Sequence, residues 1–328
     1  MEESIHGLPE YQNFQYTFTF STILASIPFL YMTPTAVVIV KIFTSYRSPS
    51  NWNTPHTMNH HIFVVIMLYF LFNTLFFLFD FLRLSLPATG IFTAWCASIQ
   101  PNHFLKIIFL LTFYCNYCVL ILPFLLCLIR LIILLYPRDH PTICSRILCI
   151  SLPLLFIIPF CCTAFMIPAL GYCRKMSHPL RFGAVYIYYS GGWEGWRNSY
   201  IHFSMSVVMC GLTILCSVLM VLKLRQSVFQ NSSVRTRQQS QRAETSLSIT
   251  MVASIIPFVN NTILTIVYLT FPDYVYYLMI FRPFGNDCET IMMPWILYLT
   301  HPMFRIKRSA SSSAVSTMAP KAKTSTVF

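Results

Sequence analysis

The chain has 328 residues, of which 56% are hydrophobic and only 10% are charged, whereas a soluble globular domain carries about 25% charged residues. This composition excludes an ordinary soluble enzyme, and the 29 Phe and 18 Tyr exclude a disordered chain, which is poor in aromatic side chains. A net charge of +12 can indicate a nucleic-acid partner, so its meaning depends on where the basic residues lie. The predicted class is a polytopic membrane protein.

Apolar stretches of about 20 residues, long enough to cross roughly 30 Å of hydrocarbon as a helix, recur along the chain. Without water to satisfy their backbone polar groups, such segments must close as helices. We predict an all-α bundle of seven transmembrane helices in one domain, residues 1–304, followed by a disordered cytoplasmic tail, residues 305–328. The predicted spans are approximately 18–43, 62–83, 104–134, 145–170, 200–223, 246–271 and 275–301.

The head of the chain, MEESIHGLPEYQNFQ, has three Glu and no Lys or Arg, unlike the basic n-region of a cleavable signal peptide. If the head is outside, the cytoplasmic segments hold 15 of the 22 Lys and Arg residues, so the positive-inside rule places the N-terminus outside and the C-terminus in the cytoplasm. Arg174, Lys175, Arg181 and Arg197 of the second outer loop weaken this asymmetry. The positive excess is therefore an orientation signal and a surface for anionic membrane lipid and a signalling partner, not for nucleic acid.

Span two carries two ionisable residues near its outer end. Asp80 and Arg83 lie three residues apart, so one face of a helix can pair them. An ionisable group within the membrane costs roughly 2.5–3.5 kcal/mol on insertion scales and usually faces the bundle interior. Either this pairing is the whole purpose of the two residues, or they belong to a larger polar site.

Two of the 12 Cys residues, Cys96 and Cys173, fall in predicted outer loops, where the environment is oxidising. A disulfide between them would fix the top of span three to the second outer loop. Two unpaired thiols are the alternative, because Cys96 lies further ahead of span three than the equivalent Cys of rhodopsin-like receptors. Most other Cys residues lie inside apolar runs, where a thiol behaves as a small hydrophobic group.

Span three ends in LCLIRLIILLYPRDH, which places Arg130 seven residues before Pro137. This spacing is similar to the D-R-Y-x-x-x-x-x-P pattern of rhodopsin-like receptors, in which the Arg holds spans three and six together at rest and contacts the G protein when they separate. Ile129 and Leu131 stand where that pattern has its acidic residue and its Tyr. The alternative is that Arg130 only extends to lipid headgroups.

The segments around span six supply a predicted inner surface and a predicted hinge. The loop RQSVFQNSSVRTRQQSQRAE is polar and basic, so Arg235, Arg237 and Arg242 join Arg130 and Pro137 as candidates for G-protein contact. In span six, Pro257 removes a backbone hydrogen bond and permits a kink, although the CWxP motif of rhodopsin-like receptors is absent.

Span seven is interrupted by Arg282, Asn286, Asp287 and Glu289, so a six-span bundle is the alternative topology. These residues would lie in the outer half of the span, at a depth similar to polar residues of spans three and six. They either line an outward-facing ligand cavity or serve interhelical hydrogen bonds, each worth around 0.6 kcal/mol or up to about 2 kcal/mol. The ligand-binding candidates are Asp80, Arg83, Tyr114, Asn116, Asn260, Arg282, Asp287 and Glu289.

The chain carries no clear signature of an enzyme or of a bound metal. The chain has no GxSxG, HExxH, P-loop or GxGxxG motif in a suitable setting, so neither an enzyme nor a cofactor is predicted. His56, His60 and His61 lie close together but lack acidic or Cys partners, so no metal site is predicted.

Several strings resemble nematode serpentine chemoreceptors, of class U within the larger group that includes class gamma. The resemblance runs from the head to the inner end of span seven. The strings are IHGLPEYQNFQ, RLSLPATGIFTAWCASIQPN, IPALGYCRKM, FGAVYIYYSG, AETSLSITM, FRPFGND and PWILYLTHPMF.

This resemblance implies a chemosensory G-protein-coupled receptor in the plasma membrane of sensory neurons, most naturally of their cilia. Such a receptor would bind an external small molecule and signal to a heterotrimeric G protein. The alternative is a different kind of membrane protein, a transporter or ligand-gated channel that uses the buried charges of span seven. The odd span count, the lack of visible repeats and the single charged cluster argue against it.

Overall fold

The computed structural model describes residues 4–47, 58–194, 196, 198–230, 275–301 and 304, with isolated positions between 259 and 271. The hinge candidate Pro257 and the ligand candidate Asn260 lie outside the described residues. The loop residues Arg235, Arg237 and Arg242 also lie outside them, as do the predicted tail and most of the sixth predicted span.

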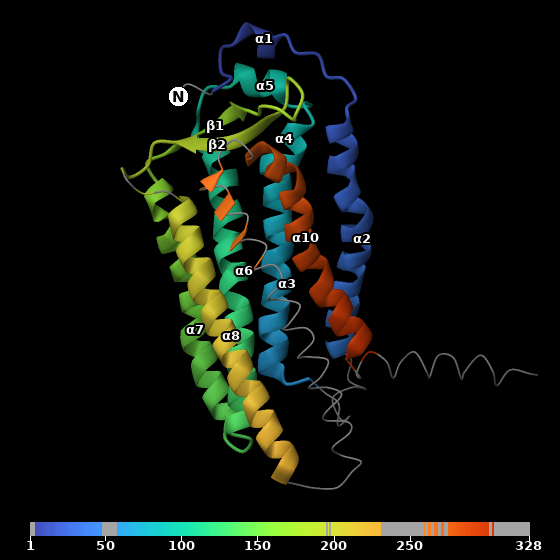
Figure 1. Ribbon diagram of the computed structural model, residues 1–328, viewed down its shortest axis with the longest axis vertical. Helices are drawn as coiled ribbons and strands as arrows, with labels where there is room; N and C mark the ends of the chain where they lie inside the picture. The colour runs from blue at the N-terminus through green and yellow to red at the C-terminus, as the bar shows by residue number, and fades with distance from the viewer. Residues whose placement is uncertain are drawn as a thin grey trace, which may run out of the picture.

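Long helices run side by side along the long axis of the molecule (Figure 1). They are α2 (Phe20–Arg47), α3 (His60–Asp80), α6 (His103–Leu135), α7 (His140–Thr163), α8 (Asn198–Gln230) and α10 (Val275–Thr300). Among the described residues, five helical segments are long and apolar enough to cross a membrane. The 26-residue helix α10 is more polar because it contains Arg282, Asp287 and Glu289. The helical bundle predicted from the apolar runs is confirmed for the described residues.

Helices α3 and α6 each begin after a residue whose side chain satisfies a free backbone N–H group of the first turn. Asn59 accepts a hydrogen bond from the backbone N–H of His61 (2.9 Å) before α3, and Asn102 accepts one from Leu105 (3.0 Å) before α6. Both are typical N-cap interactions. Helix α6 lies at the centre of the bundle, with α3, α7 and α8 packed against it.

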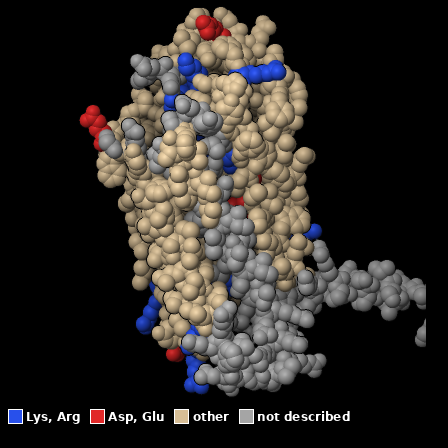
Figure 2. Space-filling view, in the orientation of Figure 1, with Lys and Arg blue, Asp and Glu red and all other residues tan. Residues whose placement is uncertain are grey.

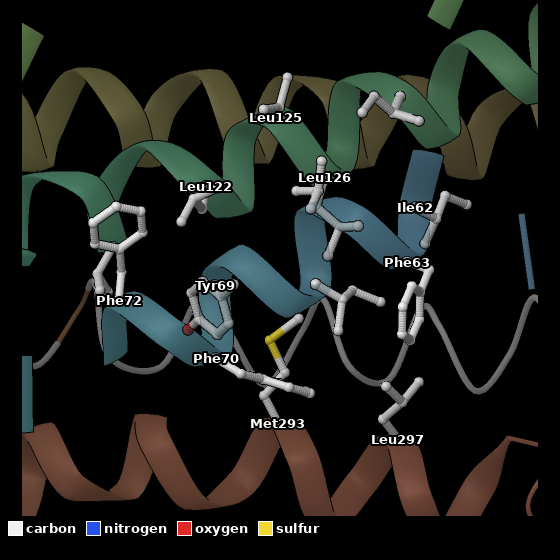
Figure 3. Packing of buried hydrophobic residues seen from close by; sticks show 14 of the residues in the cluster. Ile62, Phe63, Tyr69, Phe70, Phe72, Leu122, Leu125, Leu126, Met293 and Leu297 are labelled. Atoms are coloured by element: carbon white, nitrogen blue, oxygen red, sulfur yellow. The ribbon is translucent and has the colours of Figure 1, made fainter. Parts of the chain in front are cut away.

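The main core lies between α3, α6 and α10. Figure 3 shows Phe63 and Tyr69 of α3, Leu122 and Leu126 of α6, and Met293 of α10 in this packing. The outer surface of the bundle is also apolar, with exposed Phe, Leu, Ile and Val side chains on α2, α7 and α8. On the face drawn in Figure 2, most charged side chains lie toward the two ends, as expected for a bundle surrounded by lipid.

One end of the bundle, which we name the capped end, is covered by short elements (Figure 1). We name the opposite end the far end. The capping elements are α1 (Pro9–Gln12), the π-helical turn η2 (Phe81–Ser85), α4 (Leu86–Ala88), α5 (Thr93–Ser98), β1 (Leu170–Lys175) and β2 (Val185–Ser190). The strands β1 and β2 form an antiparallel hairpin in which Cys173 pairs with Ile187.

The predicted end of span four at residue 170 is wrong, because the hairpin begins there and the helix ends earlier. Helix α7 ends at Thr163, a short 3₁₀ turn covers Ala164–Met166, and Leu170 already belongs to β1. The apolar run continues past the helix because the hairpin packs on the bundle. At Gly171, β1 approaches the start of α6 so closely that a Cβ atom would lie 2.1 Å from the backbone nitrogen of Lys106.

Candidate functional site

The ionisable residues of α3 and α10 meet near the capped end. Asp80 at the end of α3 accepts from Arg83 of η2 at 3.2 Å, as its i,i+3 spacing predicted, and from Arg282 of α10 at 3.1 Å. The Asp80 and Arg83 side chains are 7% and 8% exposed. A carboxylate shared by two guanidinium groups therefore joins α3 to α10 inside the bundle.

The guanidinium group of Arg83 is also held by aromatic rings of α6. Its Cζ atom lies 5.1 Å from the ring centres of both Phe109 and Phe113, within the range of a cation–π interaction. Arg83 thus contacts a carboxylate on one side and two rings on the other. This arrangement stabilises its charge in the buried interior.

The two carboxylates in the middle of α10 each bind a tyrosine hydroxyl from another helix. Tyr31 of α2 donates to Asp287, and Tyr69 of α3 donates to Glu289. Among the described residues, no Lys or Arg forms an ion pair with either carboxylate. Both carboxylates thus retain acceptor capacity beyond their single tyrosine donor, because a carboxylate accepts up to about four hydrogen bonds.

A small chamber, which we name the polar chamber, lies beside Asp80 and Asp287. It is lined by Asp80, Phe81, Asn286 and Asp287, among other residues, and its free space is about the size of a water molecule. Asn286 is 6% exposed, and neither its amide nitrogen nor its oxygen has a hydrogen-bond partner in the described chain. A buried unpaired amide is costly, at about 1–3 kcal/mol, so the polar chamber presents groups that a ligand can satisfy.

An apolar cleft adjoins the polar chamber on the side of the capped end. It comprises about 500 Å³ of space outside the protein atoms, including open solvent, and Leu24, Leu84 and Met279 are among its walls. Pro28, Ser85 and Pro283 line both spaces, so the cleft and the chamber are adjacent. The lining residues come from α2, η2, α4 and α10, together with Met176 and Leu180 near the hairpin.

A second polar layer lies between α6 and α8. Asn116 contacts the Nε2 atom of His202 at 2.8 Å, and the hydroxyl group of Tyr117 donates to the side-chain oxygen of Asn198 at 3.0 Å. Tyr114 instead donates to the backbone oxygen of Phe156 in α7 at 3.3 Å. Tyr114 therefore contacts α7, whereas Asn116 and Tyr117 contact α8.

The structure brings together some of the predicted ligand-binding residues and separates others. Asp80, Arg83, Arg282 and Asp287 form one cluster, with Glu289 further along α10. Sequence reasoning missed the partners Tyr31, Tyr69 and His202, and also missed that Asn286 lacks one. A hydroxyl or imidazole group inside an apolar run needs a partner in the bundle, and that signal marks Tyr69 in VVIMLYFLF.

The capped end is held together by the disulfide between Cys96 of α5 and Cys173 of β1, whose Cα atoms lie 5.8 Å apart. The head of the chain joins the same layer, because the backbone N–H of Ile5 donates to the backbone oxygen of Cys173 at 3.2 Å. Tyr11 of α1 is buried there, and burial together with the neighbouring Glu10 carboxylate raises its pKa. The head, hairpin and α5 therefore form one cap over the bundle.

At the far end, Arg130 is only 6% exposed on α6, and Pro137 is exposed in the turn that follows this helix. Burial of Arg130 within the bundle favours an inward role over extension to lipid headgroups. Within the described residues, no group of three His, Cys, Asp or Glu side chains is placed to hold a metal ion.

Comparison with known proteins shows the family. The family model described as the serpentine type 7TM GPCR chemoreceptor Sru matches residues 5–307. The chain belongs to this family. It is 31% identical over 271 residues to serpentine receptor class U-26 of Caenorhabditis elegans, and the match covers 81% of this chain and 91% of that relative. The predicted resemblance to class U is confirmed.

The fold agrees with this membership. The chain matches the crystal structure of squid rhodopsin with a TM-score of 0.62 at 13% identity, covering 97% of this chain and 93% of that chain. This Sru receptor is therefore a chemosensory G-protein-coupled receptor with a rhodopsin-like bundle and several membrane-spanning helices. Its family is one of receptors rather than enzymes.

Proposed function

We propose that this receptor binds an external small molecule in the cleft and polar chamber, and that binding changes how the far end contacts a heterotrimeric G protein. The observation that carries the proposal is an apolar cleft leading to buried polar groups that are not fully paired. Ligand sites combine mostly apolar walls with a few convergent polar groups in the same way. The receptor family supports the same assignment.

The proposed orientation places the capped end outside the cell and the C-terminal tail in the cytoplasm. The disulfide between Cys96 and Cys173 supports it, because disulfides form and persist in oxidising compartments. The excess of basic residues in the loops expected at the far end supports it as well. The proposed location is the plasma membrane of sensory neurons and their cilia, with membrane lipid around the bundle.

The proposed coupling surface is the far end, where Arg130 and Pro137 would act with Arg235, Arg237 and Arg242. A ligand that prefers one arrangement of the bundle shifts the population toward it. A coupling free energy of roughly 1–3 kcal/mol between the two sites changes G-protein affinity by about 5–150-fold. The buried position of Arg130 supports its participation, since it can respond to movement of the neighbouring helices.

The test is a screen of volatile and water-soluble chemicals on cells that express this chain with a promiscuous Gα subunit. We expect a ligand-dependent response that Arg130→Gln reduces without loss of ligand binding, while Arg138→Gln, a matched change at an exposed position of the same end, leaves the response intact. A ligand that binds purified protein but activates no member of a Gα panel would contradict the coupling. Ligand-driven ion current or flux in liposomes would instead favour a channel or transporter.

The orientation of the chain in the membrane can be tested separately, by measuring whether an antibody reaches an epitope at the N-terminus. We expect an antibody to label it on unpermeabilised cells, while an epitope at the C-terminus requires permeabilisation. The reverse pattern would place the capped end in the cytoplasm and remove the external ligand from the proposal.

A further inference from the structure

The ionisable residues in and around the polar chamber do not balance in charge. The interior of the bundle near the capped end contains Arg83 and Arg282 against Asp80, Asp287 and Glu289, so the fully ionised set carries one excess negative charge. Both arginines contact Asp80. Among the described residues, Asp287 and Glu289 receive only the neutral hydroxyl groups of tyrosines. Of these two, Asp287 lines the polar chamber.

Asn286 provides an independent observation at the same place. Its side chain lines the polar chamber beside Asp80 and Asp287, is more than nine-tenths buried, and has no hydrogen-bond partner for either amide atom in the described chain. Buried polar groups in folded proteins nearly always have partners. Asn286, with its unpaired amide oxygen, and Asp287, with spare acceptor capacity, thus line the same space, which is about the size of a water molecule.

We propose that the polar chamber binds the ammonium group of a small primary amine, and that the apolar part of the amine occupies the adjoining cleft. This inference rests on the proposed function, since it names the chemical class of the ligand for that site. A primary ammonium group is about the size of a water molecule and has three donors, which suit Asp287, Asp80 and the Asn286 oxygen. Its charge offsets the excess negative charge of the interior.

The walls of the two spaces favour the same ligand class. Phe76, Phe77 and Phe81 line the polar chamber, and aromatic rings attract cations through their negative faces. Leu24, Leu84 and Met279 of the cleft provide an apolar surface for an alkyl or aryl group. A carboxylic acid is disfavoured because Arg83 and Arg282 are already paired with Asp80 and are not among the chamber's lining residues.

The test measures ligand binding on the purified full-length receptor, without a G protein. The probes are four compounds with one shared alkyl or aryl group: the primary amine, the alcohol, the carboxylic acid and the trimethylammonium salt. We expect the primary amine to raise the melting temperature in a saturable way and the other three to have little effect. Stabilisation by the acid or the alcohol as strong as that by the amine would overturn the proposal.

Variants at Asn286 separate a binding role from a structural one. Asn286→Leu has a similar shape and removes an unpaired buried amide, so we expect an equal or higher melting temperature without ligand. We expect amine affinity to fall by roughly 10-fold to 100-fold, because a hydrogen bond to a charged group is lost. The matched control is Cys288→Ala, an exposed position on the same helix, which should leave amine affinity unchanged. Unchanged affinity in Asn286→Leu would overturn the proposal.

Two further outcomes distinguish this inference from the proposed function. Stabilisation by sodium chloride, but not by the amine in a sodium-free buffer, would assign the chamber to an inorganic cation and overturn the inference. Amine binding without activation of any Gα subunit would leave the inference intact and contradict the signalling role. Activation by a non-amine that the amine does not displace would contradict the inference alone.

Discussion

The two halves of the bundle differ in what fills the space between the same helices. Toward the far end, α3, α6 and α10 meet through apolar side chains, among them Leu122 and Leu297 (Figure 3). Val65 and Ile66 of α3 belong to the same core, and all four side chains are fully buried. Toward the capped end, α3 and α10 meet through carboxylates, guanidinium groups and an unpaired amide. Between the described helices, the far half is packed mainly with apolar side chains, with Arg130 as a buried charged exception, whereas the capped half retains polar groups and free space.

The apolar half of the bundle mainly contributes stability, whereas the polar half has the groups that ligand binding requires. Apolar packing in the far half fixes how the helices lie, because every lost contact leaves a cavity. Buried ion pairs contribute little net stability, since desolvation offsets most of the attraction. The capped half therefore has the composition of a binding site, and the far half that of a support.

The largest expected effect comes from breaking the ion network of the capped half. Asp80→Asn leaves the buried Arg83 and the partly buried Arg282 without their carboxylate, and removal of one partner of a buried pair costs about 3–5 kcal/mol. We expect a large fall in melting temperature and in surface expression. Glu194→Gln, at an exposed carboxylate, is the control and should have no measurable effect. A stable Asp80→Asn receptor would show that the network is dispensable.

A cavity in the far half should lower the free energy of unfolding somewhat less than Asp80→Asn does, and it should leave ligand affinity unchanged. Leu122 is fully buried in the core of α6, so Leu122→Ala should lower the free energy of unfolding by about 3 kcal/mol. Leu215→Ala, at a position 54% exposed on α8, should change it by less than about 0.5 kcal/mol. Thermal unfolding checks the first effect, and ligand affinity measured below the melting temperature should equal that of the unchanged chain.

The sequence predicts the parts of this molecule that depend on local composition. Apolar length predicts the helices, and the spacing of Asp80 and Arg83 predicts their ion pair, because both follow from helix geometry. The partners of Asp287 and Glu289 could not be predicted, since Tyr31 and Tyr69 lie 256 and 220 residues away in sequence. The hairpin was missed because its strands, Leu170–Lys175 and Val185–Ser190, are short, and the first continues an apolar run.

Removal of the tyrosine hydroxyl groups that donate to the two α10 carboxylates should have a smaller effect on stability. Tyr31→Phe and Tyr69→Phe each remove one interhelical hydrogen bond, worth roughly 0.6 kcal/mol or up to about 2 kcal/mol. Tyr31 contacts Asp287 at the polar chamber, so its loss should also change ligand potency, whereas loss of Tyr69 should change stability alone. Tyr200→Phe, at an exposed tyrosine, is the control. Equal changes in potency for both variants would contradict this separation.

The central claim is that the cleft at the capped end receives the ligand, and filling the cleft tests it most directly. Leu24 of α2 lines the cleft, and its neighbour Ile23 is 48% exposed and is not among the lining residues. We predict that Leu24→Trp abolishes the response to every activating ligand, while surface expression persists and Ile23→Trp responds like the unchanged receptor. Full ligand potency in Leu24→Trp would contradict the account and place the ligand elsewhere in the bundle.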